Sequence, residues 1–310
     1  MPSCGVTAAR LFIRFLWELI LLLAVVILFL VVIFTPTTPH VTGSNIGFLF
    51  VFFSFQGSIR LNNYFLFGGI LAGGRPAPGG TYDNVVYFLQ VSDVHLSKFD
   101  VSRGEQFTIF CNETVQVVNP AIVIHTGDIT DAMMDEPSST YYQNQQQAEE
   151  WGFYKDTLTT YGYFNKSFWL DVRGNHDAYA IASYNSSTNY YLTHGVYGSE
   201  RDYTFVLNTG FGSYQFVSMD LSFDLGLSAP FDFFGLVPKD LTAIEAAVNA
   251  APNFNQTILF GHYPRVTSMN RVPWETLTKD KVLAYLCGHL HTDKMYTNMP
   301  ENYYELELEV

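Results

Sequence analysis

The sequence is poor in cysteine and in basic residues, and each shortage excludes a class of protein. Three cysteines occur in 310 residues, at Cys4, Cys111 and Cys287. That number is too small for a disulfide framework or for a zinc site built from paired cysteines. Lys and Arg number 16 against 29 Asp and Glu, which gives a net charge of −13. Since nucleic-acid-binding surfaces are basic, no such surface is expected.

The remaining composition suits a large folded domain. Hydrophobic residues make up 48% of the chain and aromatic residues 16%, which allows a sizeable core with many β-strands. No internal repeat is found. Cys287 stands in an apolar run and is expected to be a small buried side chain, with a bridge to Cys111 as the alternative.

Residues 11–34 form one long apolar stretch near the amino terminus. Its only charges are Arg14 and Glu18, and it exceeds the ~20 residues that a transmembrane helix needs. Arg10 and Arg14 lie at its amino side, which predicts a cytosolic tail of residues 1–10 and a lumenal or extracellular remainder. We therefore expect an uncleaved anchor in the lipid bilayer. A cleaved signal peptide, which has a shorter apolar core, and a buried helix are the alternatives.

The chain after this stretch divides into two parts. Residues 35–82 are interpreted as a linker of unclear structure, and residues 83–310 as a globular domain. Four Asn-x-Ser/Thr sequons support a lumenal or extracellular position for the domain. They begin at Asn112, Asn165, Asn185 and Asn255.

The globular part alternates predicted strands and helices. Five short apolar runs are interpreted as strands covered on both faces; they lie at 84–90, 120–125, 167–172, 256–260 and 282–287. Helices are predicted at 103–118, 141–160 and 240–250. The segments 203–208 and 213–220 are predicted to form an antiparallel hairpin. The expected class is α/β, with functional residues at the carboxyl ends of strands.

Each of the five apolar runs ends just before residues that bind metals. The loops contain, in order, Asp93 and His95; Asp128; Asn175 and His176; His262; and His289 and His291. Each pair or single residue alone has an ordinary explanation as a turn or a polar strand end. Alternation along an extended backbone would place His289 and His291 on one side. The shared order and position of all five loops favours one common site.

The residue types predict the class of metal. Two aspartates, one amide and four imidazoles suit Mn, Fe or Zn better than Ca or Mg, which prefer oxygen ligands. Seven ligands are too many for one ion and suit two divalent ions that share a carboxylate. Such a dinuclear centre would hydrolyse a phosphate ester with a metal-bound hydroxide. His176 would point away from Asn175 in an extended loop, which makes it the candidate general acid.

The blocks DVH, GDITD, GNHD, GH and GHLH, from about Asn84 to the end, resemble the calcineurin-like metallophosphoesterases. The resemblance implies a four-layer αββα sandwich of two mixed sheets. It implies that Asp128 bridges two metals, one bound also by Asp93, His95 and His291, the other also by Asn175, His262 and His289. It further implies that Asp177 orients His176, and that Asp131 is a turn residue or a supporting residue. The final run YELELEV is interpreted as a strand of a chain whose last strands are missing.

The leading hypothesis is a membrane-anchored phosphoester hydrolase. The alternatives are a catalytically silent receptor or scaffold that keeps the fold, and a structural membrane protein whose apolar amino terminus is the functional part. The substrate is not specified by the sequence. Segments 183–202 and 221–236 are candidate recognition loops.

Overall fold

In the computed structural model, the described residues lie between Gly47 and Leu308. The residues that it does not describe are 1–46, 54–84, 134–143, 211, 224–225, 227–234, 236–240, 269–272, 279–280, 292–293, 297–302 and 309–310. The predicted span at 11–34 therefore lies outside the described residues. Among the helices that are described, none is both long and apolar enough to cross a membrane.

Four parallel strands form the first sheet, in the order β1-β2-β3-β4. They are Gly47–Phe53, Val85–Val91, Val123–His125 and Trp169–Asp171. Strand β1 comes from the segment to which the sequence assigned no structure. In the described register, Leu89 pairs with Val123, which pairs in turn with Trp169.

Six strands form the second sheet, in the order β5-β6-β7-β8-β10-β9. They are Thr204–Thr209, Gly212–Met219, Gln256–Gly261, Ala284–Cys287, Tyr304–Glu307 and Lys294–Tyr296. β5 and β6 form the predicted antiparallel hairpin, and β9 is antiparallel to β10, while the other pairs are parallel. The expectation of two mixed sheets is therefore wrong for the described strands, because only the second sheet is mixed.

The helices predicted at 103–118 and 240–250 lie close to their predicted positions, whereas the one predicted at 141–160 begins only at Ala148, because residues 144–147 are not helical. A continuous helical segment covers α2, the π-helix η1 and α3, and it ends at Asn119, just before Pro120. In this segment α2 is Val101–Ile109, η1 is Phe110–Val115 and α3 is Gln116–Val118. The other helices are α4 Ala148–Thr160, η3 His176–Ala178, α5 Tyr191–His194, α6 Thr242–Asn249, η4 Ala251–Asn253 and α7 Trp274–Thr278. Asp100 caps α2 by accepting a hydrogen bond from the backbone N–H of Ser102.

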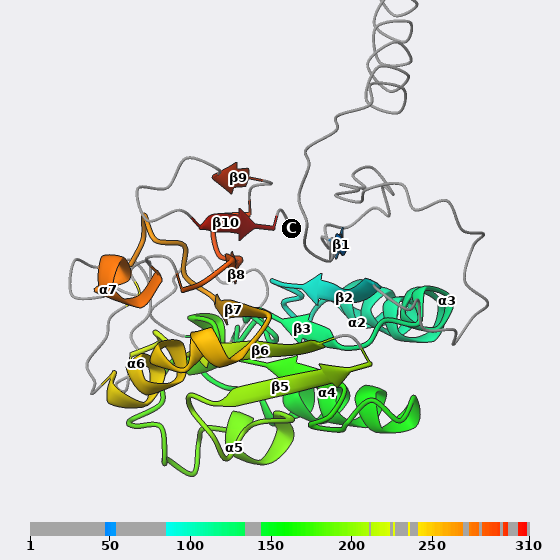
Figure 1. The fold of residues 1–310 in the computed structure, drawn as a ribbon. Coiled ribbons are helices and arrows are strands. Elements are labelled where there is room, and N and C mark those ends of the chain that lie inside the picture. The colour runs from blue at the N-terminus through cyan, green and yellow to red at the C-terminus, as the bar shows by residue number, and fades with distance from the viewer. Residues whose placement is uncertain are drawn as a thin grey trace, which may run out of the picture. The chain divides into compact units, whose positions relative to one another are not determined.

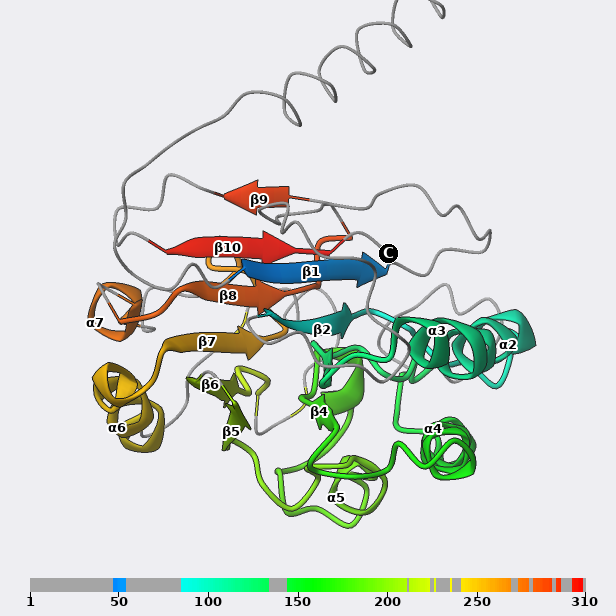
Figure 2. The ribbon, with the colours of Figure 1, turned by 45° about the vertical axis from the view of Figure 1, so that its right-hand side comes forward.

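Two buried clusters hold these elements together. In the first, Phe107 of α2 and Tyr154 of α4 pack on Trp169 of β4. Both views in Figures 1 and 2 show helices α2–α4 and helices α6–α7 on opposite sides of the strands. The α/β class, predicted from the alternation of strands and helices, is confirmed, and so is the presence of two sheets, which the resemblance implied.

Strand alternation divides the second sheet between these clusters. In β7, Ile258 and Phe260 belong to the first cluster, whereas Leu259 belongs to the second. The second cluster also contains Ile244 of α6 and Trp274 of α7. Successive side chains of a strand point to opposite faces, so one face of β7 packs with α6 and α7 and the other with the first cluster.

The two described cysteines are Cys111 and Cys287, and both are buried and free. Cys111 belongs to the first cluster and Cys287 to the second. The expected buried side chain is confirmed for Cys287, and the alternative of a bridge to Cys111 is wrong.

Candidate metal centre

The loops that follow β2 and β3 are joined by backbone hydrogen bonds. The N–H of Asp93 donates to Gly127 at 2.9 Å, and the N–H of His95 donates to Asp128 at 3.0 Å. The loop after β8 joins them, because the N–H of His289 donates to the carboxylate of Asp93 at 3.1 Å. The carboxyl ends of strands from both sheets therefore meet at one place.

Five of the seven predicted ligands have a left-handed backbone, which is uncommon for residues other than glycine. These are Asp93, His95, Asp128, His289 and His291, with φ of 52°, 47°, 50°, 83° and 53°. Each such residue costs roughly 1–3 kcal/mol and usually marks a functional site. The expectation that His289 and His291 alternate along an extended strand is wrong, because both backbones turn.

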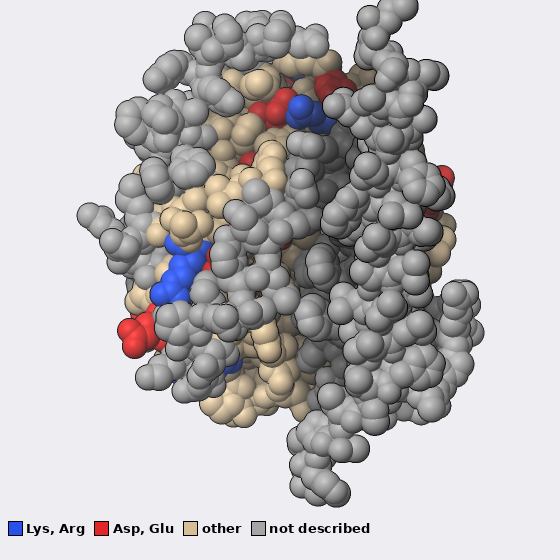
Figure 3. Space-filling model, turned by 90° about the horizontal axis from the view of Figure 1, so that it is seen from above, with Lys and Arg blue, Asp and Glu red and all other residues tan. Residues whose placement is uncertain are grey.

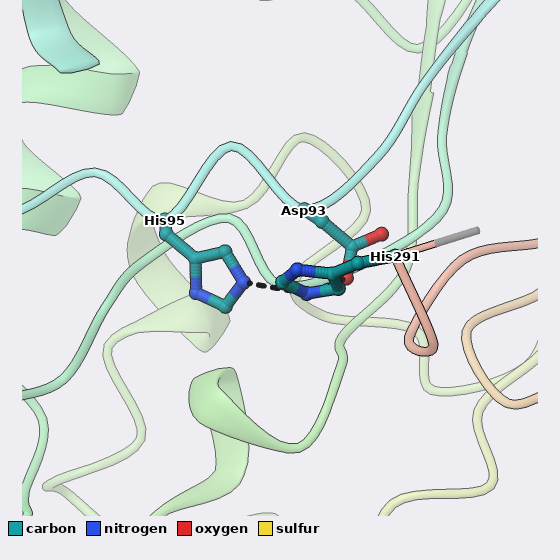
Figure 4. Close-up of side chains that lie close together, drawn as sticks. All are labelled: Asp93, His95 and His291. Atoms are coloured by element: carbon teal, nitrogen blue, oxygen red, sulfur yellow. Dashed lines mark hydrogen bonds and ion pairs between the residues drawn. The ribbon is translucent and has the colours of Figure 1, made fainter. Parts of the chain in front are cut away.

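Asp93, His95 and His291 form the first group of converging donor atoms (Figure 4). Nε2 of His291 lies 3.4 Å from Oδ1 of Asp93 and 3.4 Å from Nε2 of His95. Asp93 is fully buried, and His95 is 7% exposed. Burial lowers the pKa of His95 to about 3, so its ring is neutral and offers a lone pair.

Asp128, His262 and His289 form the second group, together with Asn175. Oδ1 of Asn175 lies 2.9 Å from Nε2 of His262 and 3.0 Å from Nδ1 of His289. Oδ2 of Asp128 lies 3.3 Å from Nε2 of His262. The same oxygen lies 3.7 Å from Nε2 of His95, in the first group. Asp128 is therefore the residue that stands between the two groups.

Hydrogen bonds on the outer side of this second group fix which atoms face inward. Nδ1 of His262 donates to the carbonyl of Thr126 at 2.9 Å, so Nε2 of the neutral ring carries a lone pair. Nδ2 of Asn175 donates to the hydroxyl of Tyr179 at 3.0 Å, so Oδ1 faces His262. Two acceptors 2.9 Å apart repel each other unless a cation lies between them.

The side chains present fit divalent cations. Metal–ligand bonds of about 2.0–2.2 Å place neighbouring ligand atoms about 3–3.5 Å apart, close to the separations in both groups. Without a metal, a proton must take the place of the cation on His262. Although burial opposes this charge, Asp128 raises the pKa of His262 to about 9. Burial also opposes the charge of Asp128, but His262 and His176 hold the pKa of Asp128 well below its usual value.

Two glycines leave the space that the carboxylates occupy. A Cβ on Gly174 would lie 2.1 Å from Oδ1 of Asp128. A Cβ on Gly288 would lie 2.1 Å from Oδ2 of Asp93. These distances are far below van der Waals contact, so both positions require glycine.

His176 lies beside the two groups. Its N–H donates to Oδ1 of Asp128 at 2.9 Å, and its Nδ1 donates to the carbonyl of Asp131 at 2.8 Å. Its ring lies edge-on to that of His95, with centroids 4.4 Å apart. The premise of an extended loop is wrong, because Asn175 has a helical backbone and η3 begins at His176.

Asp177 has other partners than the resemblance implied, whereas Asp131 has the supporting position that was one of its two alternatives. The carboxylate of Asp177 accepts hydrogen bonds from the N–H groups of Ile129, Thr130 and Gly174. It therefore ties the loop after β3 to the loop after β4, and none of its recorded hydrogen bonds reaches the ring of His176. The carbonyl of Asp131 orients that ring instead.

Arg103 was not singled out in the sequence. Its Nη1 donates to the carbonyl of His95 and lies 3.1 Å from Oδ1 of Asp131. That oxygen is 3.7 Å from Nδ1 of His95. Arg103 lies on α2, eight residues after His95, and no sequence motif in this segment indicates its role.

Residues 86–293 match the model of the calcineurin-like phosphoesterase family. The chain belongs to this family. Its members use divalent metals, which the donor atoms described above fit.

Two relatives extend this assignment. Transmembrane protein 62 of Mus musculus is 37% identical over 220 residues, which are 70% of this chain and 34% of that protein. A protein of Arabidopsis thaliana named as a metallophosphoesterase is 26% identical over 235 residues, 71% of this chain and 31% of that protein. The chain therefore spans about a third of the length of these relatives.

Two solved structures superpose weakly on part of the chain. GAP50, described as the anchor in the inner membrane complex of Plasmodium, superposes with a TM-score of 0.44 and 13% identity over 72% of this chain and 70% of that one. A protein of Staphylococcus aureus described as a 5'-nucleotidase superposes with a TM-score of 0.40 and 13% identity over 71% of this chain and 48% of that one. Similarity this weak carries no argument about function.

The charged surface is visible in part. In the view of Figure 3, the Lys and Arg side chains of the described residues are few and lie near Asp or Glu.

Proposed function

We propose that the chain is a metal-dependent phosphoester hydrolase with a dinuclear centre. One cation would be held by Asp93, His95, Asp128 and His291, and the other by Asp128, Asn175, His262 and His289. The observation that carries this proposal is the position of Asp128, whose Oδ2 faces His262 at 3.3 Å and His95 at 3.7 Å. The two sheets and their helices would form a four-layer αββα sandwich. The proposal is supported by the loops that strands of both sheets contribute to one place.

The substrate would be a phosphate ester. Two divalent cations lower the pKa of a bound water and offset the negative charge of the transition state. The protein's own contribution is orientation. Asn175 is held by Tyr179, His262 by Thr126, and His176 by Asp131. Because Nδ1 of His176 is engaged, its Nε2 is left to hold a proton for the leaving oxygen.

The membrane-anchored form of this proposal rests on residues 11–34 and on Transmembrane protein 62 as a relative. In this proposal the hydrolase domain would lie in the lumen or outside the cell, because the positive charges are at the amino side of that stretch. The partners in this proposal are the bilayer and the phosphate ester, without nucleic acid.

Asp128→Asn tests the dinuclear centre. An amide cannot supply the negative charge that two cations share, so we expect the variant to lose Mn-dependent cleavage of aryl phosphate monoesters and diesters. Its metal content should fall below that of the wild-type chain. The control is Asp156→Asn, an exposed carboxylate on α4, which should keep both properties.

The outcomes separate the two hypotheses. A wild-type chain that binds two metals but cleaves neither class of ester would favour a silent scaffold. A wild-type chain with well under one metal per molecule after reconstitution would contradict the dinuclear centre itself.

A further inference from the structure

The four Asn-x-Ser/Thr sequons share a structural property. Every one of their asparagines is exposed: Asn112, Asn165, Asn185 and Asn255. The buried asparagines among the described residues all lie outside sequons: Asn144, Asn175 and Asn189. The sequons therefore coincide with surface positions that can carry an oligosaccharide, which is bulky and needs solvent.

Asn165 lies in a tight turn that presents its side chain to solvent. Its Oδ1 accepts a hydrogen bond from the N–H of Ser167 at 2.9 Å, and its carbonyl accepts from Phe168 and Trp169. These bonds use the oxygens and leave out Nδ2, the atom to which a glycan is attached. The turn leads directly into β4, so Asn165 lies at the amino end of that strand.

Asn255 has a comparable position before β7. Its Oδ1 accepts a hydrogen bond from the N–H of Ser213 at 2.8 Å, which again leaves out Nδ2. Strand β7 spans six residues and separates Asn255 from His262. At about 3.3 Å per residue this strand is about 17–20 Å long. A glycan at Asn255 would therefore begin at the edge of the sheet opposite the metal centre.

The other two sequons are held in place by neighbouring contacts. The segment that contains Asn112 contacts the segment before Asn165, because the hydroxyl of Tyr163 donates a hydrogen bond to the carbonyl of Cys111 at 3.2 Å. Asn185 follows Tyr184, whose hydroxyl donates to Gly198 and whose ring lies 4.6 Å from the guanidinium of Arg173. Both asparagines therefore have fixed, exposed positions.

We propose that Asn112, Asn165, Asn185 and Asn255 carry N-linked glycans, and that the glycans at Asn165 and Asn255 cover the amino-end edge of the strands while the metal centre stays open. The modification places the domain in the secretory pathway. It goes beyond the proposed hydrolase function and does not depend on it.

The test is the full-length chain made in animal cells, with its mobility compared before and after digestion with peptide-N-glycosidase F. The expected result is a downward shift that resolves into four steps under limited digestion. The variants Thr114→Ala, Ser167→Ala and Ser187→Ala should each remove one step while keeping the asparagine. The fourth sequon is removed by Asn255→Gln and not by a substitution of Thr257, because the buried hydroxyl of Thr257 donates a hydrogen bond to Gln215.

A matched control and three outcomes decide the proposal. Asn253→Gln changes an exposed asparagine outside any sequon and should leave all four steps. A chain whose mobility the enzyme does not change would overturn the proposal, and so would a shift that persists when all four sequons are removed. If one of the four variants still shows four steps on digestion, the proposal is wrong for the asparagine that this variant tests. Mn-dependent hydrolysis, measured after native deglycosylation, should be unchanged.

Discussion

At the scale of single residues, His176 is the side chain whose role the geometry narrows most. Its N–H and Nδ1 are both engaged, by Asp128 and Asp131. Of the two ring nitrogens, Nε2 is therefore the one left to contact a substrate. We expect His176→Ala to lower kcat by ~10²–10⁴-fold, as loss of a general acid does.

Metal content distinguishes this role from that of a ligand. His176→Ala should keep the wild-type amount of bound Mn, measured by elemental analysis. The control is His194→Ala on α5, which should retain full kcat. A variant that loses metal and activity together would show that His176 acts by holding the centre in place.

His125 is a buried polar residue that no functional pattern uses. It is fully buried on β3 among Tyr154, Trp169 and Phe107, and neither ring nitrogen has a hydrogen-bond partner in the described structure. Burial lowers its pKa to about 3. In the unfolded chain the ring takes up a proton near pH 6.5, so acid favours unfolding as the pH falls from about 6.5 toward 3.

His125→Leu should remove this loss of stability at low pH. At pH 7.5 the variant should be more stable by about 1 kcal/mol, because an unsatisfied polar group leaves the core. At pH 4 the difference should grow to roughly 3 kcal/mol or more, at about 1.4 kcal/mol per pH unit. Urea unfolding at both pH values measures it. A difference that stays constant between the two would refute the argument.

The candidate ligands could be proposed from the sequence, but their geometry could not. Asp93, Asp128 and His262 follow apolar runs, and the order of such residues was visible without coordinates. The left-handed turns at His289 and His291 were not, because they result from hydrogen bonds such as that from His289 to Asp93. Arg103 was missed for the same reason, since its partners lie on other elements.

At the scale of elements, α4 holds two loops of the site through one carboxylate. Glu150 is 2% exposed and accepts hydrogen bonds from the N–H groups of Lys98 and Ala132 at 3.1 and 3.0 Å. Burial raises its pKa to about 7, although these bonds oppose the shift. Since the folded state keeps the proton more tightly than the unfolded state, stability falls as the pH rises from about 4.5 to about 7.

Glu150→Gln should flatten this dependence. The free energy of unfolding of the wild-type chain should fall, relative to the variant, by about 2–3 kcal/mol across that pH window. Glu149→Gln changes the exposed neighbour on the same helix and should leave the wild-type slope. Equal slopes in wild type and Glu150→Gln would exclude this carboxylate as the source.

The boundaries of helices and strands could be predicted where the sequence is strongly periodic. The prediction failed where tertiary contacts determine whether a segment forms a strand. The hairpin of β5 and β6 and the helical segment ending at Asn119 follow from local sequence. Strand β1 was missed because its residues form an apolar, aromatic run without alternation, which a membrane surface would also accommodate. Its pairing with β2 depends on a partner more than thirty residues away.

At the scale of the whole molecule, the candidate centre connects the two sheets. Asp93, His95, Asp128 and Asn175 follow strands of the first sheet, and His262, His289 and His291 follow strands of the second. Several of these residues hold strained backbones at roughly 1–3 kcal/mol each. A cation that binds only the folded chain would offset that strain and link both sheets at their carboxyl ends.

Metal removal should therefore destabilise both sheets together. At 1,000 times the dissociation constant, one cation stabilises the folded state by about 4 kcal/mol, which for a domain of this size is about 8–16 °C in Tm. Chelation should lower Tm by that amount and raise hydrogen exchange in the loops after β2, β3, β7 and β8. Mn²⁺ should restore both, whereas Ca²⁺, which prefers oxygen ligands, should not. A fall in protection confined to the loops of one sheet would contradict a shared centre, because a cation bound by one sheet alone has no reason to stabilise the other.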